Sequence, residues 1–339
     1  MHKFPLSNIA TPILSLLPPE LWHRILSIDL LIPYWHMVSD AELPHVSGLY
    51  TYRTQRQFTK DVEFFVSRYT PVAVEDLLRY LEGYGSMPRR SVLFTFDDGF
   101  REVYDIIYPI LFKKGIPAVF FPIAAAIDNC ELCYPQKKSL IVMALRSLKD
   151  SSTIREISLR LDRAGTTGDD FVTQIQKIPY QKRHLLNELG SILGIDFDSY
   201  LAAVKPYLTS DQISELIKKG FVFGGHSVDH PRYTELSLKE QLWQTKESIE
   251  FISKKFGCDC NVFAFPFTDS GISAEFFRSV SSAKLLKASF GIGGLTKSNI
   301  PRHFPRFSME RTDLPAVMIL ARQFGRALFR RDVRNMPRI

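Results

Sequence analysis

Short apolar runs rich in β-branched and aromatic residues recur along the chain, and they alternate with stretches that carry apolar residues at helical spacing. Apolar runs of this length predict buried strands. Strands that are apolar throughout and alternate with helices are typical of a parallel sheet covered on both faces, so the sequence predicts an α/β fold. The predicted strands are 30–35, 91–96, 117–123, 221–225, 261–265 and 288–292.

Two predicted helices have clear end signals. Residues 101–114 carry apolar residues at helical spacing, and Gly115 follows them as a residue type favoured just past a helix C-terminus. Ser237-Leu-Lys-Glu240 has the pattern of a capping box, which predicts a helix from there to about residue 256, before Gly257. Both helices fall where the alternating pattern requires them.

One long stretch, residues 129–219, shows little strand signal and much helical periodicity, for example at 182–193 and 211–219. We expect a helical insertion between two strands. Long excursions of this kind serve as lids or substrate-selecting walls, or only as a packing layer, and the sequence leaves both open. The predicted organisation is a first barrel part at 1–128, the insertion at 129–219, a second barrel part at 220–311 and a C-terminal helix at 312–339.

The C-terminal segment predicts a basic amphipathic helix. Its apolar and its arginine residues each repeat every four positions, two positions out of phase, which puts them on opposite faces at 100° per residue. Such a helix either lies on an anionic membrane surface or packs its apolar stripe on the body of the protein. The two series are Leu320, Phe324 and Leu328, and Arg322, Arg326 and Arg330.

Composition narrows the class of protein. A hydrophobic content of 45% excludes a disordered chain, and the formal net charge is +7. The basic residues are spread along the chain without a nucleic-acid-reading motif, so we expect no nucleic-acid partner. The apolar stretch at 13–33 is too interrupted to cross a membrane, and it lacks a cleavage pattern for secretion. The expected location is therefore the cytoplasm, with peripheral contact to the inner face of the membrane through the C-terminal helix.

The four cysteines form two close pairs, Cys130-x-x-Cys133 and Cys258-x-Cys260. Four thiolates are a possible ligand set for structural zinc. Reduced, partly buried thiols are the alternative that these loose spacings favour.

The strongest chemical signal is Thr95-Phe-Asp-Asp-Gly99, at the end of the predicted strand 91–96. Two adjacent carboxylates at the end of a buried parallel strand are costly unless a cation or a reaction uses them. Active sites in α/β folds are built at these carboxyl ends. The alternative for this motif alone is an Asp-Asp-Gly turn that caps a helix.

A second motif, Gly224-Gly-His226-Ser-Val-Asp-His230, also follows a predicted strand. Two imidazoles four positions apart suit one metal ion if the segment forms a helical turn. Two histidines and one carboxylate are a ligand set for catalytic zinc or another divalent metal. The paired glycines let the backbone pass close to a site. A third segment, Phe263-Ala-Phe-Pro266-Phe-Thr-Asp269, is weak by itself because such residues commonly only pack.

In combination, these three motifs give the chain a resemblance to the polysaccharide deacetylase family, also called the NodB-homology group or carbohydrate esterase family 4. They occur in the family's order, and the resemblance covers roughly residues 30–123 and 221–306. It implies a distorted (β/α) barrel of the NodB-homology type, here with a helical insertion. It also implies a metal-dependent hydrolase that removes an acyl group from a sugar.

The resemblance further implies roles for individual residues. Asp98, His226 and His230 would hold one divalent ion, zinc being the expected metal, and Asp97 would be the general base on the bound water. The backbone N–H of Phe267, at the family's Tyr position, would stabilise the oxyanion.

Departures from the family pattern leave two roles to other residues. The family's third motif has Arg where this chain has Ala264, so Arg306 is our candidate for the cation that orients the base. The family's Trp motif is absent, and its Leu-x-x-His motif, which supplies the general acid, is not found in that form. His303 lies in the corresponding region and is our candidate for the acid.

The leading hypothesis is a hydrolase of carbon–nitrogen bonds other than peptide bonds, which removes an N-acetyl or other N-acyl group from a sugar. That sugar would belong to a cell-surface polysaccharide or to a lipid-linked glycan. The alternative is a non-catalytic carbohydrate-binding protein on a degenerate deacetylase fold, which the missing motifs motivate. A third hypothesis is an amide hydrolase of the same mechanism with a non-sugar substrate.

Overall fold

The computed structural model describes residues 26, 28–166, 168–259, 261–296 and 298–329. Every paired strand runs parallel to its neighbours in this part of the chain. The strands are β1 (Leu30–Leu31), β2 (Pro33–Trp35), β3 (Thr70–Pro71), β4 (Ser91–Val92), β5 (Phe94–Asp98), β6 (Ala118–Pro122), β7 (Val222–Phe223), β8 (Val262–Ala264), β9 (Ala288–Gly291), β10 (His303–Pro305) and β11 (Phe307–Ser308).

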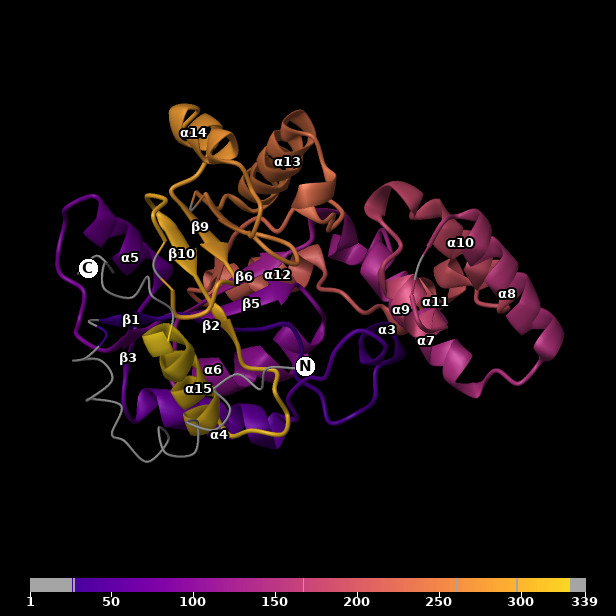
Figure 1. Ribbon diagram of the computed structural model, residues 1–339. Coiled ribbons are helices and arrows are strands. Elements are labelled where there is room, and N and C mark those ends of the chain that lie inside the picture. The colour runs from indigo at the N-terminus through magenta and orange to yellow at the C-terminus, as the bar shows by residue number, and fades with distance from the viewer. Residues whose placement is uncertain (1–25, 27, 167, 260, 297, 330–339) are drawn as a thin grey trace.

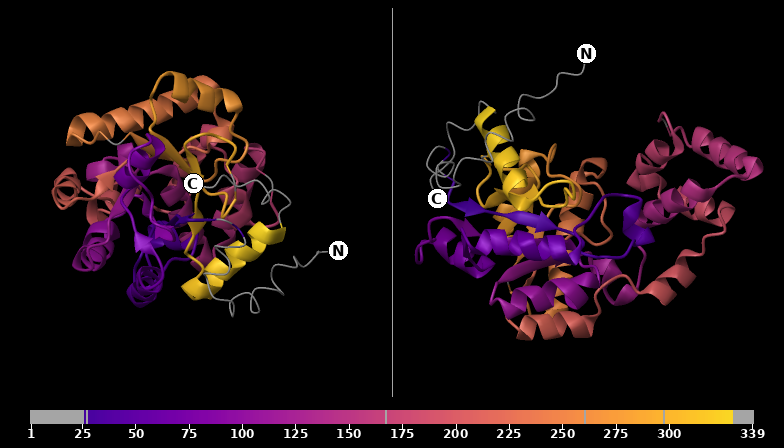
Figure 2. Two further views of the ribbon diagram at one scale, coloured as in Figure 1. Left: turned by 90° about the vertical axis from the view of Figure 1, so that its left-hand side faces the viewer. Right: turned by 90° about the horizontal axis from the view of Figure 1, so that it is seen from below.

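The strands form a distorted (β/α) barrel, which confirms the predicted fold class. The central sheet has the order β11-β2-β5-β6-β7, and the smaller sheets have the orders β1-β4-β3 and β10-β9-β8. A bridge between Gly225 and Phe263 joins β7 to β8, and Arg306 alone separates β10 from β11. Figure 2 shows the helices arranged around these strands.

All six predicted strands are present, and two of them are divided by a single residue, Ile32 and Leu93. The pattern missed β3, β10 and β11. These strands are two or three residues long, which is too short for either alternation or an apolar run to be recognised.

The helices of the barrel follow the predicted alternation (Figure 1). The capping box at Ser237 and Glu240 is formed, and Gly257 ends that helix with φ 68°. The segment predicted at 101–114 begins as a π-helical turn, Val103–Ile107, before it becomes α-helical. The barrel helices are α4 (Gln55–Val66), α5 (Val74–Leu81), α6 (Tyr108–Lys113), α12 (Ser210–Lys218), α13 (Leu238–Phe256), α14 (Ala274–Ser282) and α15 (Ala316–Phe329).

The predicted insertion forms a lobe beside the barrel, on the right of Figure 1, and its hydrophobic core also takes in Met37, Phe100 and Ile123 from the barrel. The short helix α3 (Pro44–Ser47) packs against it from the barrel side. The last helix of the predicted insertion, α12, belongs to the barrel, because Ile213 and Leu216 are buried in the barrel core beneath β7. The lobe therefore ends before residue 219. Its helices are α7 (Tyr134–Ser147), α8 (Ser151–Arg163), α9 (Phe171–Gln176), α10 (His184–Ile192) and α11 (Phe197–Val204).

The apolar stripe of α15 packs on the body of the protein. Of the predicted stripe, Leu320 and Phe324 are buried in the barrel core beside α4, together with Ile319, whereas Leu328 is exposed, as is Arg326. Of the two uses that the sequence left open for this stripe, the structure shows the intramolecular one. Arg330 and the residues after it lie outside the described part of the chain. None of the described helices has the length and the hydropathy needed to cross a membrane.

Three of the four cysteines are described, and all three are free thiols. Cys130 is exposed, Cys133 is buried and Cys258 is half-buried. Cys260 lies outside the described residues, so the zinc site considered for the two pairs stays untested.

Candidate metal centre and active site

The predicted chemical motifs meet at the carboxyl ends of neighbouring strands. Asp97 and Asp98 are the last two residues of β5, and His226 lies three residues after β7. Phe267 lies three residues after β8. The register of β5 and β6 and the bridge from Gly225 to Phe263 bring these strand ends to one rim of the barrel.

Asp98, His226 and His230 form a compact group of metal-ligating side chains. One ligand atom from each lies within 4.8 Å of the others. Asp98 Oδ1 is 3.3 Å from His226 Nε2 and 3.2 Å from His230 Nε2. All three residues are buried, with exposed fractions of 3%, 1% and 6%.

The hydrogen bonding of this group fits a divalent ion. His226 Nδ1–H donates to the carbonyl oxygen of Ala264 at 2.8 Å, which leaves the Nε2 lone pair facing Asp98. Neither Asp98 Oδ1 nor His226 Nε2 makes a hydrogen bond. A buried polar atom without a partner costs about 1–3 kcal/mol. Burial lowers the pKa of His230 more than Asp98 raises it, so the imidazole is in the neutral form that binds metal.

The segment that carries the two histidines is an irregular bend, so the helical turn that the sequence named as the condition for one shared ion is not formed. Ser227 and His230 have φ values of 65° and 61°, and the His230 N–H donates to Ser227 Oγ at 3.0 Å. This bend still brings the two imidazole rings to 4.9 Å. A Cβ on Gly224 would lie 2.5 Å from the Val262 carbonyl oxygen, which explains one of the paired glycines by close backbone approach.

Asp97, the predicted base, is held by Arg306. Arg306 Nη1 and Nη2 donate to the two carboxylate oxygens, each at 2.7 Å, and Nε donates to the Gly291 carbonyl oxygen at 3.2 Å. Burial by itself raises the pKa of Asp97, but the charge and hydrogen bonds of Arg306, together with the nearby His226 and His36, outweigh burial and the pKa is lowered. The structure thus places Arg306 where the family's motif Arg would be needed, and Asp97 is an unprotonated carboxylate.

His303, the predicted general acid, lies away from this group. Its Nδ1 is 2.8 Å from Ser289 Oγ, and its Nε2 is 3.0 Å from Asp269 Oδ2. Its ring packs against Phe277 at 5.1 Å, on the side of β10 that faces α14. Side chains alternate along a strand, so His303 and Arg306, three positions apart, point to opposite faces. None of its contacts in the described chain reaches the three candidate ligands, and its catalytic role stays a prediction.

His36 directly follows β2, and its place at a strand end in the sequence left two interpretations open, a residue that lines the site or a core histidine. Its backbone N–H and its Nδ1 contact the two oxygens of Glu310, each at 2.8 Å. Burial lowers the pKa of His36, but the charge and hydrogen bond of Glu310, together with the nearby Asp98 and Asp97, outweigh burial and raise it to about 10. His36 is therefore a cation near Asp97 and Asp98, the two carboxylates of the candidate site. Its place at a strand end was a signal in the sequence, but its partner lies 274 residues away.

Tyr50 and Phe267 complete the lining of the site. The Tyr50 hydroxyl donates to Asp98 Oδ2 at 3.4 Å, and its ring lies 5.0 Å from that of His36. The Phe267 ring lies 4.6 Å from that of His230 and 6.1 Å from that of Tyr134, which begins α7 of the lobe. The insertion therefore contributes an aromatic side chain, Tyr134, near the candidate metal ligands.

Comparisons with known proteins identify the family and the fold. Residues 84–285 match the family model described as polysaccharide deacetylase. The poly-β-1,6-N-acetyl-D-glucosamine N-deacetylase of Escherichia coli K12 is 30% identical over 96 residues, which are 28% of this chain and only 14% of that protein.

Two solved structures share the fold. The Streptococcus pyogenes deacetylase PplD, in complex with acetate, is 15% identical with a TM-score of 0.55, over 87% of this chain and 98% of that one. IcaB from Ammonifex degensii is 16% identical with a TM-score of 0.52, over 87% and 97%. Since the family model covers more than half of the sequence, the chain belongs to the polysaccharide deacetylase family.

Proposed function

We propose that this chain is a metal-dependent hydrolase that removes an N-acetyl, or other N-acyl, group from a sugar of a cell-surface polysaccharide or lipid-linked glycan. The observation that carries the proposal is the pairing of two features. Asp98 and His226 present buried ligand atoms without hydrogen bonds, and the unprotonated Asp97 stands beside them, held by Arg306. Family membership supports the same reaction class.

Asp98, His226 and His230 are the residues that would hold the metal, which we propose to be zinc. A divalent ion bound there supplies Lewis acidity toward water and toward an acyl carbonyl. The second requirement of the reaction, a free carboxylate that is not needed as a ligand, is met by Asp97.

The proton transfers are assigned to Asp97 and His36. Asp97 accepts a proton from the attacking water, whose oxygen bonds to the acyl carbon. His36, kept cationic by Glu310, donates a proton to the amine nitrogen as the carbon–nitrogen bond breaks. Acetic acid, which ionises to acetate in water, and a free amino sugar result, and the proton taken by Asp97 replaces the one that His36 gave. We place His36 in this role ahead of His303, because Ser289 and Asp269 occupy both ring nitrogens of His303.

Binding of the substrate is assigned to the residues around Phe267. Its backbone N–H is the proposed donor to the oxyanion. Its ring, with Tyr134 on one side and the Arg232 guanidinium 4.8 Å from its centroid, offers an aromatic and cationic surface next to the ligands. Aromatic surfaces with a few polar groups are typical of small-molecule sites.

The proposal is tested by measuring bound divalent metal and acetate release from N-acetylated glucosamine oligomers. We expect Asp97→Asn to retain metal and lose at least about 100-fold in turnover. His226→Ala should lose both metal and turnover, and His184→Ala, an exposed histidine of α10, should lose neither.

Two further outcomes separate the other hypotheses. A wild-type protein that binds the oligomers but releases no acetate after incubation with zinc would favour the non-catalytic carbohydrate-binding protein. Release of acetate from non-sugar amides only would favour the third hypothesis.

A further inference from the structure

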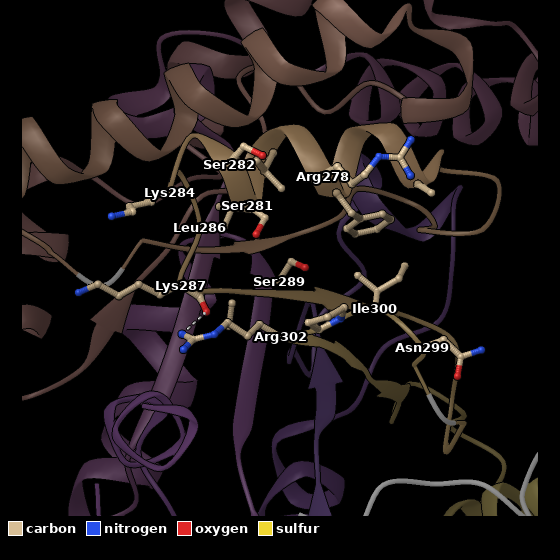
Figure 3. A pocket seen from close by; sticks show the side chains of 15 residues that line it. Arg278, Ser281, Ser282, Lys284, Leu286, Lys287, Ser289, Asn299, Ile300 and Arg302 are labelled. Carbon is tan, nitrogen blue, oxygen red and sulfur yellow. Dashed lines mark hydrogen bonds between the residues drawn. The ribbon is translucent and has the colours of Figure 1, made fainter. Parts of the chain in front are cut away.

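A cavity lies on the outside of the barrel, toward the amino end of β9. It has a volume of about 770 Å³ and lies between α14 and the strands β9 and β10 (Figure 3). The described residues that connect β9 to β10 contain no helix, so α14 is the helix that covers this part of the barrel wall. The cavity is lined at the amino end of β9, where Lys287 and Ala288 lie, whereas the candidate metal centre lies at the carboxyl ends.

The lining of this cavity combines cations with an apolar wall. Lys284, Lys287 and Arg302 gather at one end of it, and Arg278 lies toward the other. No aspartate or glutamate is among the residues that line it. The hydroxyl groups of Ser281 and Ser289 point into it in Figure 3. The larger apolar side chains of the lining are Phe277, Val280, Leu286 and Ile300.

The three clustered cations are only partly compensated. Lys287 Nζ donates to the Asp259 carbonyl oxygen at 2.7 Å and lies 3.9 Å from that residue's carboxylate. Arg302 contacts only carbonyl oxygens, those of Leu81 at 3.3 Å and Lys287 at 3.5 Å. Within the described chain, the Lys284 side chain makes no ion pair or hydrogen bond, and only its backbone N–H donates, to the Ser281 carbonyl oxygen at 3.0 Å. Like charges that share a site disfavour one another, and an anion relieves that repulsion.

We infer that this cavity is a binding site for an organic phosphate. The phosphate group lies at the end formed by Lys284, Lys287 and Arg302, where ammonium and guanidinium groups donate charge-assisted hydrogen bonds to its oxygens. The apolar part of the ligand lies along Phe277 and Ile300. A volume of about 770 Å³ suits a small organic molecule and is much larger than a phosphate ion needs. This site is separate from the proposed deacetylase reaction.

The test uses n-octyl phosphate below its micelle concentration as the probe, with titration calorimetry on the full chain. Two comparison probes each lack one part of this molecule. Inorganic phosphate has no apolar chain, and octyl glucoside has no phosphate group. We expect octyl phosphate to bind at least about tenfold more tightly than either. Lys284→Gln should weaken it by roughly tenfold, because it removes a charged donor. Lys177→Gln, an exposed lysine of the insertion lobe, should leave binding unchanged.

A second variant guards against indirect effects. Ser281→Trp fills the cavity from an exposed position on α14 without removing a charge, and it should abolish binding while the melting temperature and acetate release stay near those of the wild type. Equal affinity of the wild type and Ser281→Trp for octyl phosphate, or no affinity in either, would overturn the inference.

A sedimentation assay distinguishes the source of the phosphate. If phosphatidylglycerol vesicles cosediment with the wild type but not with Ser281→Trp, the bound phosphate belongs to a lipid headgroup. Octyl phosphate binding without sedimentation would place it on a soluble ligand. Both outcomes support an organic phosphate in this cavity.

Discussion

The Arg306 guanidinium donates two hydrogen bonds of 2.7 Å to the two carboxylate oxygens of Asp97, although 209 positions separate the two residues in the sequence. The pair is buried, with exposed fractions of 0% for Arg306 and 2% for Asp97. Arg306 reaches Asp97 because it stands between β10 and β11, where the chain passes from one sheet of the barrel to the next. A cation from between β10 and β11 thus supplies the positive charge that Ala264 lacks.

Removing this cation should cost both stability and turnover. Arg306→Met leaves Asp97 as a buried charge without a partner, which destabilises by about 3–5 kcal/mol. The double variant Arg306→Met/Asp97→Asn should regain most of the lost free energy of unfolding, because it no longer buries an unpaired carboxylate. Urea unfolding of the wild type, both single variants and the double variant measures this coupling. If the losses in unfolding free energy of the two single variants add up in the double variant, the two residues are not coupled as an ion pair.

The pairing of His36 with Glu310 predicts the alkaline limit of activity. The pKa of His36 is raised from 6.5 to about 10, so this group stabilises the fold fully below pH 6.5 and loses its contribution as pH rises through about 10. Glu310→Gln removes the main raising charge, so the alkaline limb of kcat should move to lower pH.

Rates measured between pH 6 and 10.5 check this shift. Asp313→Asn, which neutralises an exposed acid, should keep the alkaline limb of the wild-type kcat profile. An unchanged limb in Glu310→Gln would rule His36 out as the titrating group.

Metal binding should be visible as thermal stability, without any assay of activity. Ligand that binds only the folded state stabilises by roughly 2.7 kcal/mol at one hundred times Kd. We expect added zinc to raise the melting temperature of the wild type and of His303→Gln, but not that of Asp98→Ala. Scanning calorimetry with and without a chelator makes the measurement. A zinc response in Asp98→Ala equal to that of the wild type would exclude this group as the site.

The aromatic side chain from the insertion predicts an effect on substrate alone. Tyr134→Ala removes the ring that faces Phe267, so kcat/KM for N-acetylated oligomers should fall about tenfold. Bound zinc should stay unchanged, because Tyr134 contacts none of the three ligands. Leu159→Ala, an exposed residue of the same lobe, is the matched control. Normal kcat/KM in Tyr134→Ala would make the insertion a packing layer at this point.

The sequence by itself determined the strands and the chemistry at their ends. Apolar runs longer than four residues predicted β2, β5, β6, β7, β8 and β9, because burial on both faces leaves a local signature. The acid pair and the two histidines were recognisable because each motif is contiguous. The residues 129–219 were recognisable as helical for the same reason.

Only the tertiary structure decided which distant residues meet. The partners Arg306 for Asp97 and Glu310 for His36 come from elements hundreds of positions away, and no local pattern encodes such a contact. The strands β10 and β11 are too short for a periodic signal, so the direction of His303 could not be foreseen. The bend at His226 and His230 depends on left-handed backbone at non-glycine residues, which the packed barrel imposes against local preference.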